Sequence, residues 1–395
     1  MPPQSRADNL GARILDLLRD FGPLSRVELS DRLDMPRGRI VSEIDALIDT
    51  GLVRDGGLAP SRGGRPSTLV ELSPEIRYAA IDLGATSIDI EITNGRLEPL
   101  AGHSEDADIS MGPVATLQRV SELLAKIRGS AGAQRFDAIG IGVPGPVSVR
   151  DGMPISPPIM PGWHRFPLRA TAEIEYGCPV VVDNDVNIMT VGEAHRGIAN
   201  AMPNFLFVKL GTGIGCGIHL AGRVYRGADG SAGDIGHIQV DPRGQRCHCG
   251  GVGCLEAAFS GLAIKRDAVE AAVSGASPFL KARHDAGVIL SARDVGDGAI
   301  QGDATCVRLV REGGRMLGEV LAGVVSFINP SMVVIGGGMA GLGNLLLAEV
   351  RSVVYKRSLP LATGNLPIVL SELGPRAGVA GAAVLASDLN HFHPR

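Results

Sequence analysis

Apolar residues recur every three or four positions through the first fifty residues, a pattern that predicts helices. One face of the first predicted helix carries Leu10, Ile14, Leu17, Leu18 and Phe21. The next segment, "LSRVEL", places Glu28 three residues after Ser25, which is the spacing of a capping box. A second helix is therefore expected to begin at Ser25 and to run to about Leu33. A third, beginning at Pro36 and ending at Gly51, has the apolar stripe Ile40, Ile44, Leu47 and Ile48.

The segment "GLVRDGGLAPSRGGRPSTLVEL" has two apolar runs around a Gly/Ser/Pro/Arg tip, which predicts a β-hairpin. Helices followed by such a hairpin within residues 1–74 are typical of a winged helix-turn-helix DNA-binding domain. The segment holds ten Arg against eleven Asp or Glu, so the DNA prediction depends on where the arginines lie. Arg37 and Arg39 open the third helix, and Arg62 and Arg65 lie at the hairpin tip. The alternative is a dimerisation module with a solvated wing.

From Arg77 onward the pattern changes to β-branched runs separated by Gly-rich turns, which predicts an α/β domain. Two of these turns are hairpins of a kind that can wrap backbone N–H groups around a phosphate, and a third Gly-rich segment ends a strand. "YAAIDLGATSIDIEIT" carries Asp82, Gly84 and Thr86 at a hairpin turn. "FVKLGTGIGCGIHLAG" has Gly211, Thr212 and Gly213 at a second turn, and the strand "INPSMVVIGGGM" ends in Gly336, Gly337 and Gly338. Each turn alone is more often structural, but the ordered set favours a nucleotide site.

A further strand in "CPVVVDNDVN" ends in the polar residues Asp183, Asn184, Asp185 and Asn187. Polar groups at the carboxyl end of a strand are where α/β folds place ligands. A carboxylate there can deprotonate a sugar hydroxyl for attack on a phosphate. The alternative is a capped turn that only leads into the next helix.

The segment "GHIQVDPRGQRCHCGGVGCLEA" brings together three of the six cysteines and two of the nine histidines. One imidazole and three thiolates, from His237, Cys247, Cys249 and Cys254, complete a tetrahedral Zn²⁺ shell with no open position. The segment lacks the second histidine pair and the apolar helix of a DNA-reading zinc finger. The alternative is three buried cysteines without a metal, and His248 is a competing ligand in an awkward position beside Cys247.

Chain length and composition limit the number of domains, the way nucleic acid can be contacted and the location of the protein. At 395 residues the chain is long enough for two or three domains, and its 54 glycines suit an α/β fold with many tight turns. The net charge of −4 means that nucleic acid must be contacted through a local patch. No apolar run is long enough to span a membrane, and no secretion signal is visible, so we expect a cytoplasmic protein.

Taken together, the winged module and the motifs "DLGAT", "GVPGPV", "PGW", "NDVN", "LGTGIG", "AGDIGH", "CHCGGVGCLE" and "NPSMVVIGGG" resemble the ROK family of repressors, open reading frames and kinases, in particular its transcriptional regulators. The resemblance covers nearly the whole chain. It implies an α/β fold of the actin-like ATPase (ribonuclease H-like) type, with one lobe at 75–189 and a second, zinc-bearing lobe at 190–395. A C-terminal helix can pack back on the first lobe in this arrangement.

The resemblance also implies roles for individual residues. Asn184 and Asp185 match the sugar-holding Asn and the catalytic base of the kinases, while Asp234 stands where these usually have Glu. His237, bound to structural zinc, and Glu256 belong to the same implied sugar site. The nucleotide loops match Asp82, Gly84 and Thr86, and Gly211, Thr212 and Gly213, with Gly336, Gly337 and Gly338 as the third Gly-rich segment.

Three departures from the kinase pattern decide the predicted function. Ala85 crowds the first phosphate loop, Ser87 replaces a lysine there, and Ile159 stands where the kinases usually have a sugar-binding Asn. We therefore expect a sugar-responsive repressor, forming a homodimer or tetramer, whose partners are operator DNA and a sugar or sugar-derivative effector. The first alternative is an active sugar kinase, which alone would need ATP and Mg²⁺. The second is a scaffold whose winged module only dimerises.

Overall fold

The computed structural model describes residues 9–59 and 67–392. The N-terminal module contains helices α1 (Leu10–Phe21), α2 (Arg26–Leu33) and α3 (Arg37–Asp49). Its small antiparallel sheet has the order β1-β3-β2, with β1 at Leu24–Ser25, β2 at Val53–Leu58 and β3 at Thr68–Leu72. This is the winged-helix arrangement predicted from the sequence. Arg62 and Arg65 lie outside the described residues.

The capping box and the helix-ending glycine predicted for this module are confirmed. The Ser25 hydroxyl accepts a hydrogen bond from the Glu28 N–H at 3.2 Å, and the Glu28 carboxylate accepts one from the Ser25 N–H at 2.8 Å. Gly51, with a φ of +72°, follows the end of α3. The prediction was wrong for Phe21, whose ring is 57% exposed and lies 4.2 Å beneath the Arg32 guanidinium.

The first lobe is built on a five-stranded sheet of order β10-β7-β4-β5-β6. Strands β4 (Tyr78–Leu83), β5 (Ser87–Thr93) and β6 (Pro99–Asp106) are antiparallel, and β7 (Ala138–Val143) and β10 (Val180–Asn184) add in parallel. Helix α4 (Pro113–Arg128) packs on β5 and β6, and α5 (Leu168–Tyr176) packs on β10. A short hairpin, β8 (Val147–Ser148) with β9 (Met153–Pro154), follows β7.

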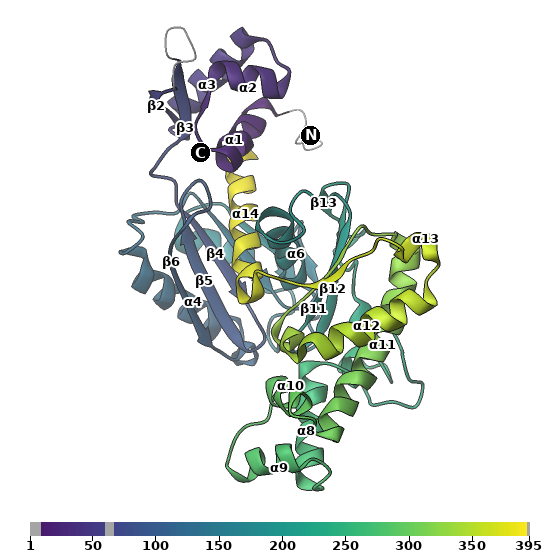
Figure 1. Ribbon diagram of the computed structural model, residues 1–395. Helices are drawn as coiled ribbons and strands as arrows, with labels where there is room; N and C mark the ends of the chain where they lie inside the picture. Colours follow the sequence, from purple (N-terminus) through teal and green to yellow (C-terminus); the bar gives the residue numbers. More distant parts are fainter. Residues whose placement is uncertain (1–8, 60–66, 393–395) are drawn as a thin grey trace.

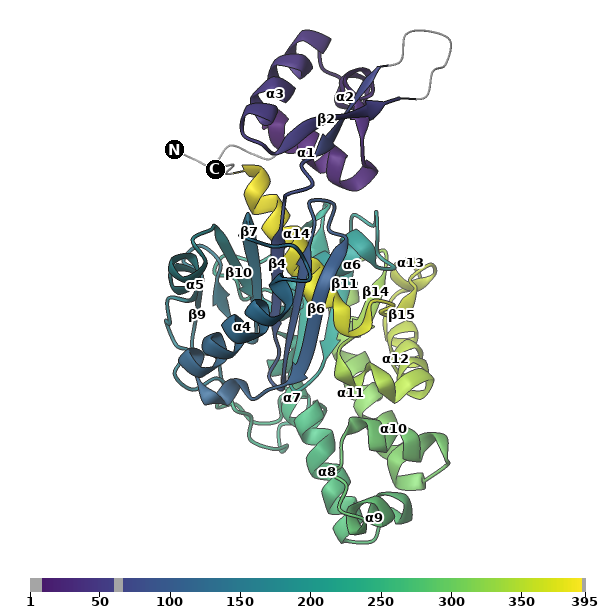
Figure 2. The ribbon, with the colours of Figure 1, turned by 90° about the vertical axis from the view of Figure 1, so that its left-hand side faces the viewer.

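The second lobe repeats this topology with the sheet order β13-β12-β11-β14-β15. Its strands are β11 (Phe205–Leu210), β12 (Ile214–Leu220), β13 (Arg223–Val224), β14 (Val333–Gly336) and β15 (Ile368–Leu370). Helices α11 (Ala304–Ile328) and α12 (Gly343–Arg357) pack together beside this sheet, and the short α13 (Pro360–Thr363) follows α12. Helices α7 (Leu255–Ala258), α8 (Gly261–Val273), α9 (Pro278–Asp285) and α10 (Ala292–Ile300) lead to the end of the molecule farthest from the winged module (Figure 2). The repeated sheet order confirms the predicted two-lobed actin-like fold.

Two helices cross between the lobes. Helix α6 (Asp185–Arg196) follows β10 of the first lobe but packs on β11 and β12, while α14 (Ala377–Phe392) follows β15 of the second lobe but packs on β4 and β7. Glycines let the two helices touch: a Cβ on Gly381 would lie 1.7 Å from the Ile188 carbonyl oxygen. The lobe boundary expected at residue 189 falls inside α6.

Helix α14 also reaches the winged module, where its last turns lie against α1 (Figure 1). Arg19 of α1 is buried and donates to Asp388 at 2.8 Å and to Ser387 at 3.3 Å. His391 lies 3.0 Å from Asp16 of α1. In the part of the chain that the structure describes, no helix combines the length and the apolar character needed to cross a membrane.

Candidate ligand cleft and metal centre

The polar residues predicted after β10 lie where the two lobes meet. Asn184 caps α6: its side-chain oxygen accepts from the N–H of Val186 at 2.9 Å and of Asn187 at 3.3 Å. Its amide nitrogen donates to the Gly145 carbonyl at 2.8 Å. Asn184 therefore forms the capped turn that the sequence offered as an alternative. Asp185, the first residue of α6, is almost fully buried at the base of the site.

Asp185 forms an ion pair with Lys209, the penultimate residue of β11. Burial works against the ammonium charge, but the carboxylates of Asp185 and Asp82 outweigh it and raise the pKa of Lys209. Sequence reasoning did not select Lys209. The available signal was one charged residue in the otherwise apolar strand "FLFVKL".

Asp82, at the end of β4, completes a group of three charges. It is 9% exposed, and among the described residues its Oδ1 has no hydrogen-bond partner. Burial raises the pKa of Asp82 to about 7, although the Lys209 ammonium acts in the opposite direction. The Asp82 carboxylate also lies against the first turn of α14, because a Cβ on Gly378 would lie 1.7 Å from its Oδ2.

Asp183 forms a different ion pair, with Arg226. It accepts from the Arg226 Nε at 2.8 Å and from the Asn187 side chain at 2.8 Å, and it is 1% exposed. Because Arg226 follows β13 of the second lobe and Asp183 is the penultimate residue of β10 in the first, this ion pair connects the lobes. Arg226 is a second residue that sequence reasoning missed, since only the fold brings it to Asp183.

The Gly-rich turns lie at the strand ends beside this charge group. In the first lobe, the Gly84 N–H donates to the Ser87 carbonyl at 2.9 Å, and Thr86 is exposed. The Gly211 N–H donates to Gly213 at 3.0 Å, with Thr212 between them and half-buried. Strands β11 and β14 are neighbours, so the third segment, comprising Gly336, Gly337 and Gly338, lies beside the second.

Four potential metal ligands converge in the loop after β13. The ligand atoms of His237, Cys247, Cys249 and Cys254 all lie within 4.8 Å of one another. The Cys247 sulfur is 3.5 Å from Nδ1 of His237, whereas Nε2 of the same ring is directed to Asp234 at 3.8 Å. The ring is therefore placed between the cysteines and a carboxylate.

The backbone of this loop is compact because its glycines allow it. The Gly253 N–H donates to the Gln245 carbonyl at 2.8 Å, and a Cβ on Gly253, whose φ is +69°, would lie 1.5 Å from the Asp241 carbonyl oxygen. The Cys247 N–H donates to Gly251 at 2.9 Å. Burial raises the pKa of Cys254 to about 12, and a bound zinc ion would instead favour its thiolate form.

Glu256 connects the loop that carries His237, Cys247, Cys249 and Cys254, here called the metal loop, to the second Gly turn. It lies in α7, two residues after Cys254, and its Oε2 accepts from the Ile214 N–H at 3.0 Å. A Cβ on Gly213 would lie 2.5 Å from the same oxygen. From the other side Val186 packs on Gly215, so the start of β12 connects the Asp185 end of the site with the His237 end.

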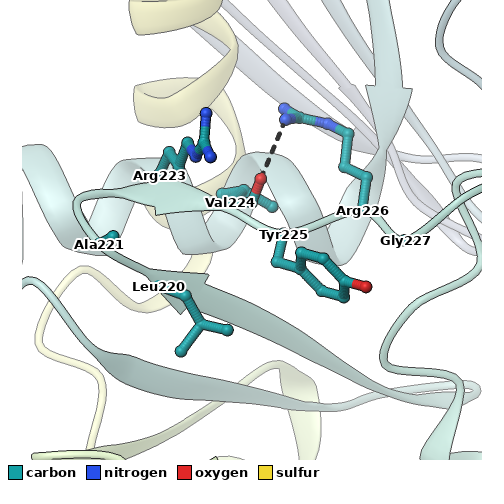
Figure 3. A pocket seen from close by; sticks show the side chains of 7 residues that line it. All are labelled: Leu220, Ala221, Arg223, Val224, Tyr225, Arg226 and Gly227. Carbon is teal, nitrogen blue, oxygen red and sulfur yellow. Dashed lines mark hydrogen bonds between the residues drawn. The ribbon is translucent and has the colours of Figure 1, made fainter.

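A surface hollow of about 360 Å³ lies at the turn between β12 and β13 (Figure 3). It is lined by Leu220, Ala221, Arg223, Val224, Tyr225, Arg226 and Gly227. Arg226 donates to the Val224 carbonyl at 3.3 Å in this view and also forms the ion pair with Asp183. None of the sugar-binding or nucleotide-binding residues expected from the sequence lines the hollow.

Comparison with known proteins establishes the family. The model of the ROK family matches residues 78–389. The chain belongs to the ROK family. It is 31% identical over 388 residues to a putative xylose repressor of Caldicellulosiruptor sp. strain Rt8B.4, and the match covers 96% of each chain. The ROK-family resemblance found in the sequence is thus confirmed.

Two solved ROK structures differ in the share of this chain that they match. A ROK family transcriptional regulator, described as a homologue of the E. coli MLC protein, has a TM-score of 0.83 at 27% identity and covers 98% of this chain and 97% of its own. A ROK family glucokinase from Streptomyces griseus, solved with glucose and AMPPNP, has a TM-score of 0.70 at 29% identity. The glucokinase match covers 99% of that chain but 78% of this one.

Proposed function

We propose that this ROK protein is a sugar-responsive transcriptional repressor. The observation that carries the proposal is the extent of similarity: the xylose repressor and the regulator structure match the chain almost from end to end. The glucokinase matches 78% of it. The ROK family model begins at residue 78, after the winged module, so the module is what this chain has in addition to a sugar-kinase fold.

The module would bind operator DNA through α3. Arg37 and Arg39 lie exposed in the first turn of this helix, and among the described residues no side chain caps its N-terminus. Exposed arginines beside free helix N–H groups suit contacts with phosphates and base edges. Arg62 and Arg65 at the wing tip stay a prediction. A homodimer or tetramer would present two modules to a two-fold operator.

The effector would be a sugar or sugar derivative held by Asn184, Asp185, Asp234, His237 and Glu256. Support comes from their placement: Asp185 is buried and paired with Lys209, His237 and Asp234 face one another, and Glu256 accepts a hydrogen bond from Ile214, next to the Gly211–Gly213 turn. Carboxylates and an imidazole accept hydrogen bonds from hydroxyls in this setting. The half-buried, apolar Ile159 does not add a polar contact.

Zn²⁺ is the proposed occupant of the His/Cys centre. Three sulfurs and one imidazole nitrogen are the donor set that a structural zinc site uses, and their mutual distances suit a single ion. Bound there, zinc would fix Nδ1 of His237 and leave Nε2 directed away from the cysteines. It would also anchor Cys254, and through it Glu256.

Two assays test the function against its alternatives. Repression predicts that the protein retards its own promoter DNA in a gel shift and that a sugar from a panel of D-xylose, D-glucose and N-acetyl-D-glucosamine changes this binding. Failure to bind the DNA would favour a scaffold in which the module only dimerises. Coupled ADP release with the same panel would instead favour a sugar kinase, for which Asp185 and the Gly turns provide the residues.

A further inference from the structure

The charge arrangement at the cleft base differs from what a magnesium–nucleotide site requires. Two buried carboxylates, Asp82 and Asp185, come from the first lobe, and one ammonium, Lys209, comes from the second. The ammonium donates to Asp185, and the charge of Asp82 acts with that of Asp185 to raise the pKa of Lys209. A divalent cation between these carboxylates would meet a positive charge that is already there.

The strands on both sides of β11 leave room for the lysine side chain at this position. In the sheet register Lys209 is paired with Gly215 on β12 and with Gly336 on β14. Glycine on both neighbouring strands leaves no side chain beside the lysine, so its chain can extend to Asp185. The Lys209 side chain remains only 20% exposed.

We propose that Lys209 is an internal cation that takes the place of a divalent metal between Asp82 and Asp185. The cleft would then bind its sugar without Mg²⁺ and without a magnesium–nucleotide complex. This inference rests on the proposed sensor function and explains how the sensor differs from a kinase. It assigns a role to Lys209 and to the unpartnered oxygen of Asp82.

The ion pair also occupies the oxygens of Asp185. Oδ2 accepts from Lys209, while Oδ1 accepts from the Val186 N–H at 2.8 Å and from the Asn184 side chain at 3.0 Å. A sugar hydroxyl approaching Asp185 would meet a carboxylate that is already neutralised and hydrogen-bonded. Asp185 Oδ2 still has a second lone pair that can accept a hydrogen bond, whereas the Lys209 cation beside it is already paired and is not available to a phosphate.

The test is a titration of Mn²⁺ against the full-length, zinc-loaded protein, with free Mn²⁺ measured by EPR. Lys209→Met removes the charge and keeps the length of the side chain, and Lys209→Arg keeps the charge. We expect the wild type and Lys209→Arg to bind no Mn²⁺ that depends on Asp82. Lys209→Met should gain one Mn²⁺ per chain, bound at least ten-fold more tightly than by the wild type, and the added change Asp82→Asn should abolish the gain.

Two results would overturn the proposal: Asp82-dependent Mn²⁺ binding by the wild type, or no gain in a folded neutral variant. Lys209→Gln provides a second neutral variant if Lys209→Met does not fold, as judged by its melting temperature and zinc content. Sugar-induced shifts in melting temperature and operator binding, measured on the same wild-type protein without Mn²⁺, test the sensor function separately. A sugar response without the expected Mn²⁺ result would therefore reject the role of Lys209 alone.

Discussion

At the scale of single residues, Asp82 combines burial with an oxygen that has no partner among the described residues. Burial raises its pKa from 3.8 to about 7. Between those values the folded state holds the Asp82 proton more tightly than the unfolded chain does. The contribution of this group to stability is therefore greatest at low pH and is lost as the pH rises through the folded pKa.

Replacing Asp82 with asparagine should remove this pH dependence. Relative to the wild type, Asp82→Asn should gain stability when the pH is raised from about 5 to about 8, because the wild type must then ionise a buried carboxyl. Melting temperatures of both proteins across this range provide the measurement. Asp229→Asn, at an exposed position of the second lobe, is the control and should follow the wild type. A constant difference between Asp82→Asn and the wild type would contradict the expectation.

Substitution of Asp185 is a second single-residue test, and its result distinguishes a sugar sensor from a sugar kinase. If Asp185 accepts a hydrogen bond from the sugar, Asp185→Asn should weaken sugar binding by about ten-fold or more, because a hydrogen bond to a charged group is lost. Calorimetry with the sugar that shifts the wild-type melting temperature measures this, with the exposed Asp285→Asn as control. Sugar phosphorylation by the wild type that Asp185→Asn abolishes, while sugar binding survives, would point to the kinase instead.

At the scale of elements, the metal loop with its four potential metal ligands also holds residues of the proposed sugar site and leads through Glu256 to a Gly turn. Loss of one ligand by Cys249→Ser should release the ion, free the His237 ring, and loosen Cys254 and the adjoining Glu256. We expect the zinc content to fall from about one per chain and the sugar affinity to fall with it. His248→Ala is the matched control, since His248 is exposed in the same loop. Unchanged sugar affinity in Cys249→Ser protein without zinc would disprove the coupling.

The elements also show which features a sequence can predict. The capping box of α2 depends on residues three apart, and the Gly-rich turns and the His/Cys set each lie within short segments, so the sequence indicated them. Phe21 was placed wrongly because its exposure depends on what packs against α1. Lys209 and Arg226 were missed because each meets its carboxylate only when the second lobe folds against the first. Long-range pairing of this kind leaves no periodic pattern in the chain.

At the scale of the whole molecule, α14 connects the cleft with the winged module. Its first turns lie on Asp82 and on α6, and its last turns contact α1 through Arg19. Burial disfavours the charge on Arg19, but Asp388, Asp16 and Asp20 outweigh it and raise its pKa. A rearrangement of the cleft around a sugar would therefore reach the module through one continuous helix.

The buried Arg19 is the place to interrupt this connection. Arg19→Met removes the cation that Asp16 and Asp388 share at this contact. The contact between α1 and α14 should weaken, while the residues proposed to bind the sugar, none of which lies in α1 or α14, are unchanged. We expect sugar affinity to stay within about two-fold of the wild type and the effect of sugar on operator binding to fall several-fold.

Arg13→Met is the matched control for this experiment. Arg13 lies on the same helix, but its guanidinium donates within the module, to the Leu33 carbonyl at 3.4 Å. Calorimetry with the sugar and gel shifts with and without it, on both variants, separate binding from transmission. Since coupling between two sites is reciprocal, operator DNA should also alter sugar affinity in the wild type and in Arg13→Met, and much less in Arg19→Met. An undiminished sugar effect in folded Arg19→Met would show that the signal reaches the DNA-binding helices by a route other than the contact between α14 and α1.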